Sequence, residues 1–384
     1  MTGRDIFLVS NNVDEMGGVT TWSHQMARLF TEQGHRVHVI GVVPAPEEQR
    51  ADLGADLPYR TTTLYDAHPP QAVPAARGIK GRLNIAEQRR RAARQAGMQE
   101  QADKLSALFR GARPGGVVIV TQVWAMEWVN LADTAGLPVV GMTHESFDAC
   151  RKSSRFARVK KHYKGVDRLL ALTREDADLW IRQGMDNADF MPNPLPALPE
   201  VPSDRTAKVV VSIGRLSDEK GVDLLLDTWA MVAPDHPDWT LRIYGSGDDE
   251  DLLKKQAEAL GLTDSVAFMG RTDDVAGALR GASVFAQSSR AEGFPLSLME
   301  AMACGVPCAA FDSAPGVHEI VRDGEDGLLA VVGNTTELAR HIDALICDKE
   351  LRDRLGTAAR ENVRRYSTDR IVKRWEELFA LLER

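Results

Sequence analysis

The chain has few cysteines. It contains four among 384 residues, too few for the disulfide framework of a secreted protein. Cys304 and Cys308 lie four positions apart, but Gly305 and Pro307 separate them, and no histidine or second cysteine pair is close in sequence. We therefore expect two buried thiols that pack like small apolar side chains, rather than a metal site.

Long apolar runs are also missing. No segment approaches the roughly 18 uninterrupted apolar residues of a membrane-spanning helix. The first apolar run, residues 6–9, is too short for the core of a signal peptide. We expect a cytoplasmic protein, with peripheral contact at an acidic inner membrane face left open.

An excess of positive charge is absent as well. The formal net charge is -8, which excludes a general nucleic-acid-binding function for the whole chain. Hydrophobic residues make up 43% and charged residues 27%, the balance of a globular enzyme. A chain of this length exceeds one ordinary hydrophobic core and indicates two domains.

Short apolar runs alternate with helical patterns in both halves of the chain. The expected strands are residues 6–9, 37–40, 117–120, 139–142 and 169–172, then 209–211, 241–244, 266–269, 284–287 and 308–311. Strands of this kind are buried on both faces, as in parallel sheets covered by helices. The fold class is therefore α/β, with two doubly wound, Rossmann-like domains facing across a cleft. Such sheets bind ligands at the carboxyl ends of their strands.

Proline marks the domain boundary. Residues 192–206 contain five prolines, which excludes a continuous helix or a central strand. We expect an amino-terminal domain over 1–192, a linker over 193–206 and a carboxyl-terminal domain over 207–365. A final helix over 366–384 is expected to pack back on the first domain.

Two glutamates follow the expected strand at 284–287. Glu292 lies in the loop and Glu300 in a helix expected to begin near Pro295. A carboxylate accepts hydrogen bonds from two vicinal hydroxyls, as in a sugar ring or ribose. The backbone N–H groups of Gly293 and Phe294 lie beside the helix N-terminus, which favours negative charge. The alternative is one capping and one surface glutamate.

Two further loops are suited to bind phosphate. Arg215 and Lys220 lie five residues apart in a loop between a strand and a helix, so both can converge on one phosphate group. The alternative is a surface salt bridge with a neighbouring acid. Gly17 and Gly18 lie between the first strand and the first helix, where glycine lets the backbone approach a phosphate, although such a pair often marks only a turn.

Taken together, these motifs resemble those of family-four retaining glycosyltransferases of the GT-B fold, over nearly the whole chain. The segments that carry the resemblance are GRLSDEKGVDLLL, IYGSGDD, VAFMGR, SSRAEGFPLSLMEAMACGVP and HEIVRDGEDGLL. The family's E-x7-E element falls on Glu292 and Glu300. The resemblance implies that Glu292 meets the donor sugar and Glu300 the nucleotide ribose.

The resemblance also implies roles for other positions. Arg215 and Lys220 match the family's diphosphate-binding pair, and Gly18 its phosphate-approaching glycine. Arg271 falls where the family's backbone reads the base. His144, after the strand at 139–142, matches the active-site histidine beside the donor sugar; a core or surface histidine is the alternative. Pro295 replaces a common glycine and removes one N–H donor from the sugar loop.

Metal and cofactor are not expected. Asp176 and Asp178 mimic the D-x-D metal motif of another glycosyltransferase fold, but they lie in a helical pattern, so we expect a solvated helix face. Residues 77–94 hold seven Lys or Arg against one Glu, and residues 151–164 hold seven and no acid. These segments are either solvated helix faces or a surface for an anionic acceptor or an acidic membrane.

The expected function is retaining transfer of a hexose or N-acetylhexosamine from a nucleotide diphosphate donor to an acceptor hydroxyl. UDP is favoured over GDP by family frequency alone. The acceptor is an anionic cell-envelope glycan, a polyol phosphate or a lipid-linked molecule. Two alternatives are a sugar-nucleotide 2-epimerase of the same fold and an inactive sugar-nucleotide-binding protein.

Overall fold

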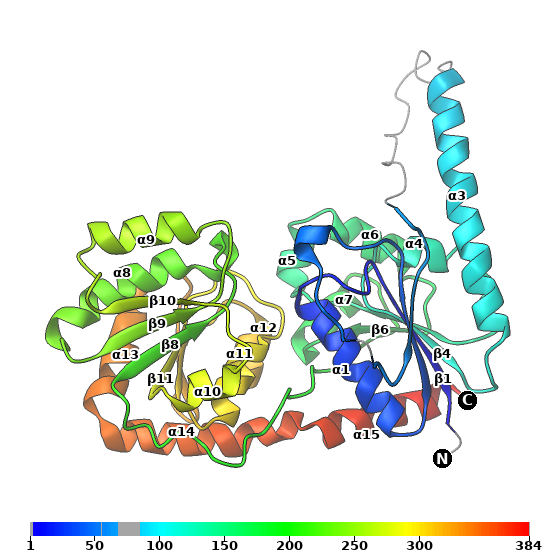
Figure 1. Cartoon of the computed structure of the whole chain (residues 1–384). Coiled ribbons are helices and arrows are strands. Elements are labelled where there is room, and N and C mark those ends of the chain that lie inside the picture. Colours follow the sequence, from blue (N-terminus) through cyan, green and yellow to red (C-terminus); the bar gives the residue numbers. More distant parts are fainter. Residues whose placement is uncertain (1–2, 55, 68–84, 384) are drawn as a thin grey trace. The chain divides into compact units, whose positions relative to one another are not determined.

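The computed structural model describes residues 3–54, 56–67 and 85–383. The chain divides into two compact units, each with its own parallel sheet (Figure 1). Unit 1 comprises Met1–His144, Cys150–Phe190 and Val372–Arg384, and unit 2 comprises Glu145–Ala149 and Met191–Ile371. No helix of the described residues combines the length and the apolar character needed to cross a membrane.

The sheet of unit 1 is parallel and has the order β3-β2-β1-β4-β5-β6-β7. Its strands are β1 (Asp5–Ser10), β2 (Arg36–Gly41), β3 (Arg60–Thr63), β4 (Val117–Val120), β5 (Val139–Met142), β6 (Arg168–Ala171) and β7 (Ala188–Phe190). Every residue of β1, β4 and β5 is buried. The strand order reverses between β1 and β4, which creates a crevice at their carboxyl ends.

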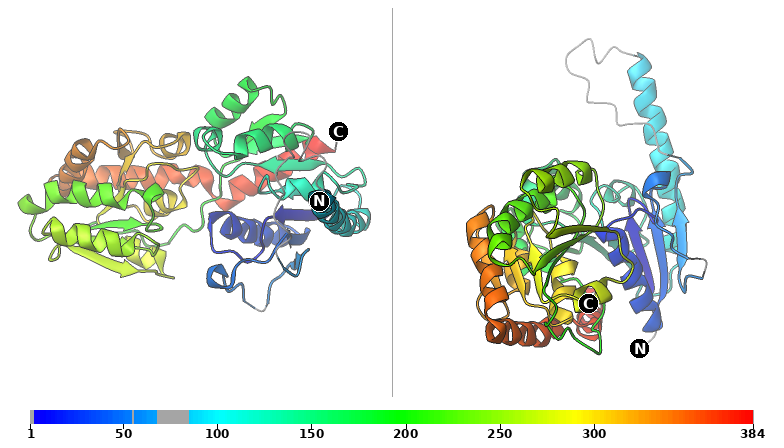
Figure 2. Two further views of the ribbon diagram at one scale, coloured as in Figure 1. Left: turned by 90° about the horizontal axis from the view of Figure 1, so that it is seen from above. Right: turned by 60° about the vertical axis from the view of Figure 1, so that its left-hand side comes forward.

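Helices cover both faces of this sheet. Those in the first half of the chain are α1 (Gly18–Glu32), α3 (Ile85–Arg110), α4 (Met126–Val129), α6 (Arg155–His162) and α7 (Arg174–Arg182), with the short 3-10 helix η1 (Glu47–Gln49). The short helix α5 (Phe147–Arg151) is divided between the units, since unit 2 includes Glu145–Ala149 and unit 1 resumes at Cys150. The carboxyl-terminal half of α3 buries Met98, Leu105 and Phe109. Its amino-terminal half extends beyond the sheet and is mostly exposed (Figures 1 and 2).

The end of the chain completes the core of unit 1. Helix α15 (Thr368–Leu382) contributes Trp375 and Phe379, which are both buried. The ring of Phe30 on α1 lies 5.7 Å from Trp375 and 5.6 Å from Phe379 between centroids. Burial of such large aromatic side chains is strongly stabilising, so residues 372–383 are an integral part of unit 1.

The sheet of unit 2 has the order β10-β9-β8-β11-β12-β13, and all its strands are parallel. Its strands are β8 (Val209–Ile213), β9 (Thr240–Tyr244), β10 (Val266–Gly270), β11 (Val284–Gln287), β12 (Cys308–Phe311) and β13 (Gly327–Ala330). The order reverses between β8 and β11. The expected α/β class with two doubly wound sheets is confirmed.

Three helices of unit 2 begin at a side-chain cap. The helices of this unit are α8 (Val222–Val232), α9 (Glu250–Ala259), α10 (Val275–Arg280), α11 (Leu296–Ala303), α12 (Pro315–Ile320), α13 (Thr335–Cys347) and α14 (Lys349–Val363), with the 3-10 helices η2 (Asp218–Lys220), η3 (Ala233–Asp235) and η4 (Arg364–Tyr366). The side chains of Asp274, Asn334 and Asp348 each accept a hydrogen bond from a backbone N–H in the first turn of the helix that follows. Such caps satisfy N–H groups that the helix itself leaves unpaired.

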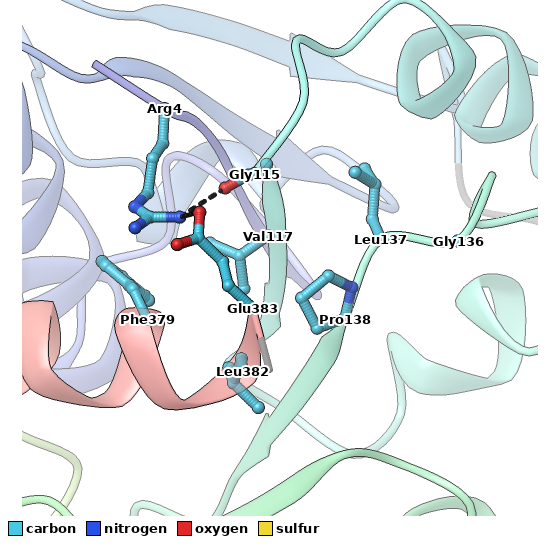
Figure 3. A pocket seen from close by; sticks show the side chains of 10 residues that line it. Arg4, Gly115, Val117, Gly136, Leu137, Pro138, Phe379, Leu382 and Glu383 are labelled. Carbon is cyan, nitrogen blue, oxygen red and sulfur yellow. Dashed lines mark hydrogen bonds and ion pairs between the residues drawn. The ribbon is translucent and has the colours of Figure 1, made fainter. Parts of the chain in front are cut away.

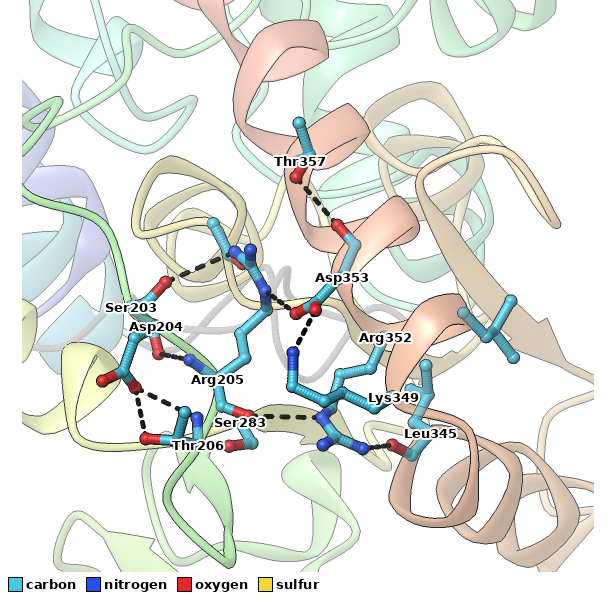
Figure 4. Close-up of polar contacts among 12 residues, drawn as sticks. Ser203, Asp204, Arg205, Thr206, Ser283, Leu345, Lys349, Arg352, Asp353 and Thr357 are labelled. Atoms are coloured by element: carbon cyan, nitrogen blue, oxygen red, sulfur yellow. Dashed lines mark hydrogen bonds and ion pairs between the residues drawn. The ribbon is translucent and has the colours of Figure 1, made fainter.

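The proline-rich segment is attached to unit 2 by polar contacts. Arg205 adopts a left-handed backbone conformation with φ 57°. Its guanidinium donates to the Asp353 carboxylate at 2.9 Å and to the Gly305 carbonyl at 2.9 Å (Figure 4). Ser203 donates to the carbonyl of Ala282 at 2.7 Å. These bonds explain why the segment expected as a linker belongs to unit 2 from Met191 onward.

Candidate active site

The switch point of the unit 2 sheet carries a small pocket. The pocket lies at the carboxyl ends of β8 and β11, the neighbouring strands between which the sheet order reverses. Its lining consists of Ser212, Ile213, Gly214, Lys220, Val222, Ile243, Gln287, Ser288, Ser289, Glu292 and Ser297. It therefore joins the loop after β8, expected to bind phosphate, to the loop after β11, expected to bind sugar.

The two loops touch because one glycine permits it. Gly221 ends η2 with φ 60°, and a Cβ there would lie 2.2 Å from the carbonyl oxygen of Ser288. The Ser288 hydroxyl donates to the Gly221 carbonyl at 2.7 Å. A side chain at Gly221 would both strain the backbone and separate the loops. This contact brings Lys220, which precedes Gly221, next to the loop after β11.

Lys220 and Glu292 form an ion pair in this pocket. The Lys220 Nζ atom donates to Glu292 Oε1 at 2.7 Å. Gln287, the last residue of β11, donates to the same oxygen at 3.1 Å. Glu292 is only 8% exposed, so its carboxylate depends on these two donors. The alternatives of a capping Glu292 and of a surface salt bridge from Lys220 to a neighbouring acid are not what the structure shows.

Arg290 fastens the same two loops together and is not among the sequence-predicted residues. Its guanidinium donates to both oxygens of the Asp223 carboxylate, at 2.7 and 2.5 Å. It also donates to the Asp218 carbonyl at 2.8 Å, and its backbone N–H donates to the Glu219 carbonyl at 2.8 Å. Hydrogen bonding from Arg290 lowers the pKa of the Asp223 carboxyl. Bidentate pairs of this kind are geometrically specific.

The backbone around Gly293 is tightly packed. A Cβ at Gly316, in the first turn of α12, would lie 2.0 Å from the Gly293 carbonyl oxygen. Phe294 is buried, with its ring edge-on to Tyr366 at 5.2 Å between centroids. Pro295 is the N-cap of α11, which begins at Leu296. The helix therefore begins near Pro295, as expected, with Pro295 itself in an extended backbone conformation as the N-cap.

Glu300 on α11 is largely buried and uncompensated. In the described part of the chain its carboxylate has no hydrogen-bond or ion-pair partner, and burial raises its pKa to about 7. Arg215 is exposed, and no side-chain partner for it is found among the described residues. Arg271 is exposed too and follows Gly270, which has φ 68°. The structure thus places Glu300, Arg215 and Arg271 in unit 2, outside the set of residues that lines the small pocket.

The predicted residues of unit 1 lie at the carboxyl edge of its sheet. Gly17 is the N-cap of α1 and Gly18 its first residue, with open space where a Cβ would stand on either. His144 follows β5, and its ring lies edge-on to Trp22 at 4.9 Å between centroids. Its Nε2 atom is buried and has no partner among the residues described. Burial lowers the pKa of His144 to about 4, so the imidazole is neutral at physiological pH.

Comparison with known proteins identifies the family to which this chain belongs. Residues 198–362 match the family described as glycosyl transferases group 1. An uncharacterized glycosyltransferase of Haemophilus influenzae is 34% identical over 238 residues, which cover 61% of this chain and 67% of that protein. The chain belongs to the group 1 glycosyltransferases.

One further relative and one solved structure show how much of the chain these similarities cover. The poly(glycerol-phosphate) alpha-glucosyltransferase of Bacillus subtilis is 27% identical over 250 residues, which cover 63% of this glycosyltransferase but only 37% of that protein. The crystal structure of a Staphylococcus aureus TarM mutant, in complex with fondaparinux, alpha-GlcNAc-glycerol and UDP, superposes with a TM-score of 0.78 at 16% identity over 98% of this chain and 99% of that chain. This likeness establishes the GT-B fold.

Several polar groups at the carboxyl edge of unit 1 in this glycosyltransferase were not predicted. Asn11 follows β1, and its backbone N–H donates to the side-chain oxygen of Gln122, which follows β4, at 2.9 Å. The Asn11 side-chain oxygen and the Thr143 hydroxyl are buried without partners among the described residues. Buried polar atoms without partners are unusual and often mark a ligand site. The sequence signal was a polar residue directly after each buried strand.

Two smaller predictions can be assessed. The expectation of a solvated face at Asp176 is wrong: Asp176 is buried in the first turn of α7 and bonds the capping Thr173 hydroxyl at 2.7 Å, whereas Asp178 is exposed. The local hydrogen bond to the N-cap explains the burial. The expectation of buried thiols at Cys304 and Cys308 is confirmed.

A larger cavity lies at the opposite edge of the unit 1 sheet. It has a volume of about 510 Å³ and lies at the amino ends of β4 and β5, beside the end of α15 (Figure 3). Arg4 and Glu383 form an ion pair beside it, and Phe379 and Leu382 supply apolar walls. None of the predicted site residues lines this cavity.

The two basic segments differ in what the structure shows of them. Residues 77–84 lie outside the described residues. In the other segment, 151–164, Lys152, Lys160, Lys161 and Lys164 are exposed, while Arg158 pairs with Glu127. A cationic surface over α6 is therefore present on unit 1.

Proposed function

We propose that this glycosyltransferase moves a hexose or N-acetylhexosamine from a nucleotide diphosphate donor, UDP in preference to GDP, with retention of anomeric configuration. The observation that carries the proposal is the Lys220–Glu292 pair, a partly exposed lysine bound to a buried glutamate, in the pocket at the β8/β11 switch point. In this pair, the Lys220 ammonium, which we assign to the diphosphate, lies beside the Glu292 carboxylate, which we assign to the sugar hydroxyls.

The departing diphosphate has to be stabilised as the bond to the sugar breaks. We assign this role to the Lys220 ammonium, which Glu292 holds, together with the exposed Arg215 guanidinium, and propose that these two cations take the place of a metal ion. By the family resemblance, we also assign Gly17 and Gly18 at the start of α1 to phosphate binding through their backbone N–H groups. We assign Glu300 to the ribose hydroxyls and, by the family resemblance, the backbone at Arg271 to the base.

Glu292 is better suited to bind the sugar than to attack it. Its Oε1 accepts hydrogen bonds from both Lys220 and Gln287, which lowers its nucleophilicity. We therefore propose attack by the acceptor on the face of the sugar that the diphosphate leaves. The C1–O bond to phosphate breaks, the acceptor oxygen bonds to C1, and the acceptor proton passes to the departing phosphate oxygen. His144, which is neutral and whose Nε2 has no partner in the described part of the chain, is assigned to the donor sugar.

The acceptor is proposed to be anionic, with a polyol-phosphate polymer as the first candidate. The cationic surface over α6 supports this choice, because seven Lys or Arg lie in residues 151–164 without an acid in a chain of net charge -8. The similarity to the poly(glycerol-phosphate) alpha-glucosyltransferase of Bacillus subtilis points the same way.

Donor use is tested by incubating the protein separately with UDP-glucose, UDP-galactose, UDP-N-acetylglucosamine and GDP-mannose and following nucleoside diphosphate release. We expect slow release from one UDP-sugar, unaffected by EDTA and lost in Arg215→Ala and Glu300→Ala. Glu325→Ala, on the exposed turn between α12 and β13, is the matched control and should keep full turnover. Absence of both release and UDP binding would overturn the proposal.

Acceptor and stereochemistry are tested with the donor so identified. Poly(glycerol-phosphate) should raise nucleotide release and acquire α-linked sugar, as seen by the anomeric NMR signal. A neutral glycan of the same length and vesicles of anionic lipid serve as comparisons. A β-linked product would contradict retention, and an epimerised donor without transfer would identify an epimerase.

A further inference from the structure

Three side chains that commonly bind metals converge on the surface of unit 2, away from the donor pocket. His236 follows η3, and Asp343 and Cys347 lie one turn apart on α13. His236 Nε2 lies 2.7 Å from Asp343 Oδ1. Cys347 Sγ lies 3.8 Å from His236 Nε2 and 3.7 Å from Asp343 Oδ1.

We propose that His236, Asp343 and Cys347 form a binding site for a divalent transition-metal ion of the zinc class. One imidazole nitrogen, one thiolate and one carboxylate oxygen are the ligand types that zinc takes in proteins. A tetrahedral zinc ion with bonds of about 2.0–2.3 Å needs ligand atoms roughly 3.3–3.6 Å apart. The two distances from sulfur need to shrink by only tenths of an ångström.

The distance between His236 Nε2 and Asp343 Oδ1 shows which existing interaction a metal ion would replace. At 2.7 Å it is a hydrogen bond, in which a proton lies between His236 and Asp343. Binding would remove that proton and the thiol proton and open the pair by about half an ångström. The exposed side of the site leaves a fourth position for water.

A thiol within reach of both partners distinguishes this cluster from an ordinary ion pair. His318 and Asp312 of the same unit make a comparable contact, with Nδ1 and Oδ1 2.7 Å apart, yet the residues described bring no cysteine to that pair. At the proposed site, the negative charge of Asp235 also acts on the Cys347 thiol. A dication is favoured where several anionic groups converge.

Metal binding would tie two separate elements of unit 2 together. His236 ends the connection from α8 to β9, whereas Asp343 and Cys347 lie in the last two turns of α13, which packs against α8. A metal bridge between them stabilises the folded state by mass action, because the unfolded chain does not hold the three ligands together. The site is independent of the proposed function, and its occupation should not alter donor turnover.

The test uses the whole protein, freed of metal with a chelator and kept reduced with a non-thiol reductant. Titration with Co²⁺ should give one equivalent of binding and a thiolate-to-cobalt charge-transfer band. Zn²⁺ should displace the cobalt and raise the melting temperature by several degrees. Cys347→Ser should lose the band, and His236→Ala should lose at least tenfold in affinity.

His318→Ala is the matched control and should bind cobalt like the wild type. Each variant is first shown to melt cooperatively without metal, so that a folding defect is not read as loss of binding. A band that survives in Cys347→Ser, or equal melting temperatures with and without Zn²⁺ in the wild type, would overturn the proposal. Donor release measured in the same samples reports separately on the proposed function.

Discussion

The ammonium of Lys220 lies 2.7 Å from the carboxylate of Glu292, although 72 residues separate them in the chain. The contact exists because Gly221 lets the loop after β8 meet the loop after β11. A buried carboxylate that loses its cation is costly, whereas a partly exposed lysine that loses its carboxylate can be hydrated. The two partners should therefore respond differently to substitution.

Lys220→Met should lower the free energy of unfolding by about 1–3 kcal/mol, because only Gln287 would remain to compensate Glu292. Glu292→Gln should cost less, because the Lys220 side chain is 27% exposed. Urea unfolding at neutral pH measures both. Lys254→Met, which removes an exposed pair with Glu250 on α9, should leave the urea midpoint almost unchanged. Equal losses in all three variants would contradict the argument.

Arg290→Ala should reduce donor turnover about 10- to 100-fold, because the loop carrying Glu292 would lose its attachment to the loop carrying Lys220. Turnover is measured by nucleotide release and stability by urea unfolding. Arg205→Ala is the matched control, since it removes another Arg–Asp pair of unit 2, with Asp353 on α14, and neither residue belongs to the two loops (Figure 4). It should cost stability while sparing turnover. If both variants lose turnover in proportion to stability, Arg290 has no special positioning role.

Glu300 should make unit 2 less stable as pH rises. Its pKa is raised from 4.5 to about 7 in the folded state. Between these values the folded chain holds a proton that the unfolded chain has released, so stability falls as pH increases through this window. Relative to Glu300→Gln, the wild type should lose roughly 1–3 kcal/mol between pH 4.5 and 7. Parallel pH profiles of unfolding free energy for the two proteins would refute this.

His144 should make unit 1 less stable as pH falls, the opposite of the dependence expected for Glu300. Its pKa is lowered from 6.5 to about 4 by burial. Between these values the unfolded chain binds a proton that the folded chain does not, so stability falls as pH decreases from 6.5 to 4. In the His144→Gln variant, the free energy of unfolding lost between pH 6.5 and 4 should be smaller by roughly 1–3 kcal/mol. Thermal unfolding at a series of pH values tests it, and an unchanged acid limb in the variant would show that other groups cause the destabilisation.

The strands missed by sequence reasoning share a physical feature. The central strands were identified from apolar runs, because strands buried on both faces must be apolar. All three are edge strands that are incompletely buried: β3 reads Arg-Thr-Thr-Thr and is mostly exposed, no residue of β7 is buried, and the middle two residues of β13 are only partly buried. Such strands are defined by backbone pairing with a neighbour, as in the register of His38 with Arg60. Side-chain pattern carries little of that information.

The amino-acid sequence by itself determined the two doubly wound sheets, the family and the residue types of the donor loops, because these depend on local hydrophobic pattern and short motifs. Only the tertiary structure decided which charges meet. Lys220 pairs with Glu292 rather than with a neighbouring acid, Arg290 pairs with Asp223, and Glu300 is left without a partner among the described residues. Such pairings depend on how strands distant in sequence are placed side by side, and a glycine such as Gly221 then sets how closely their loops approach.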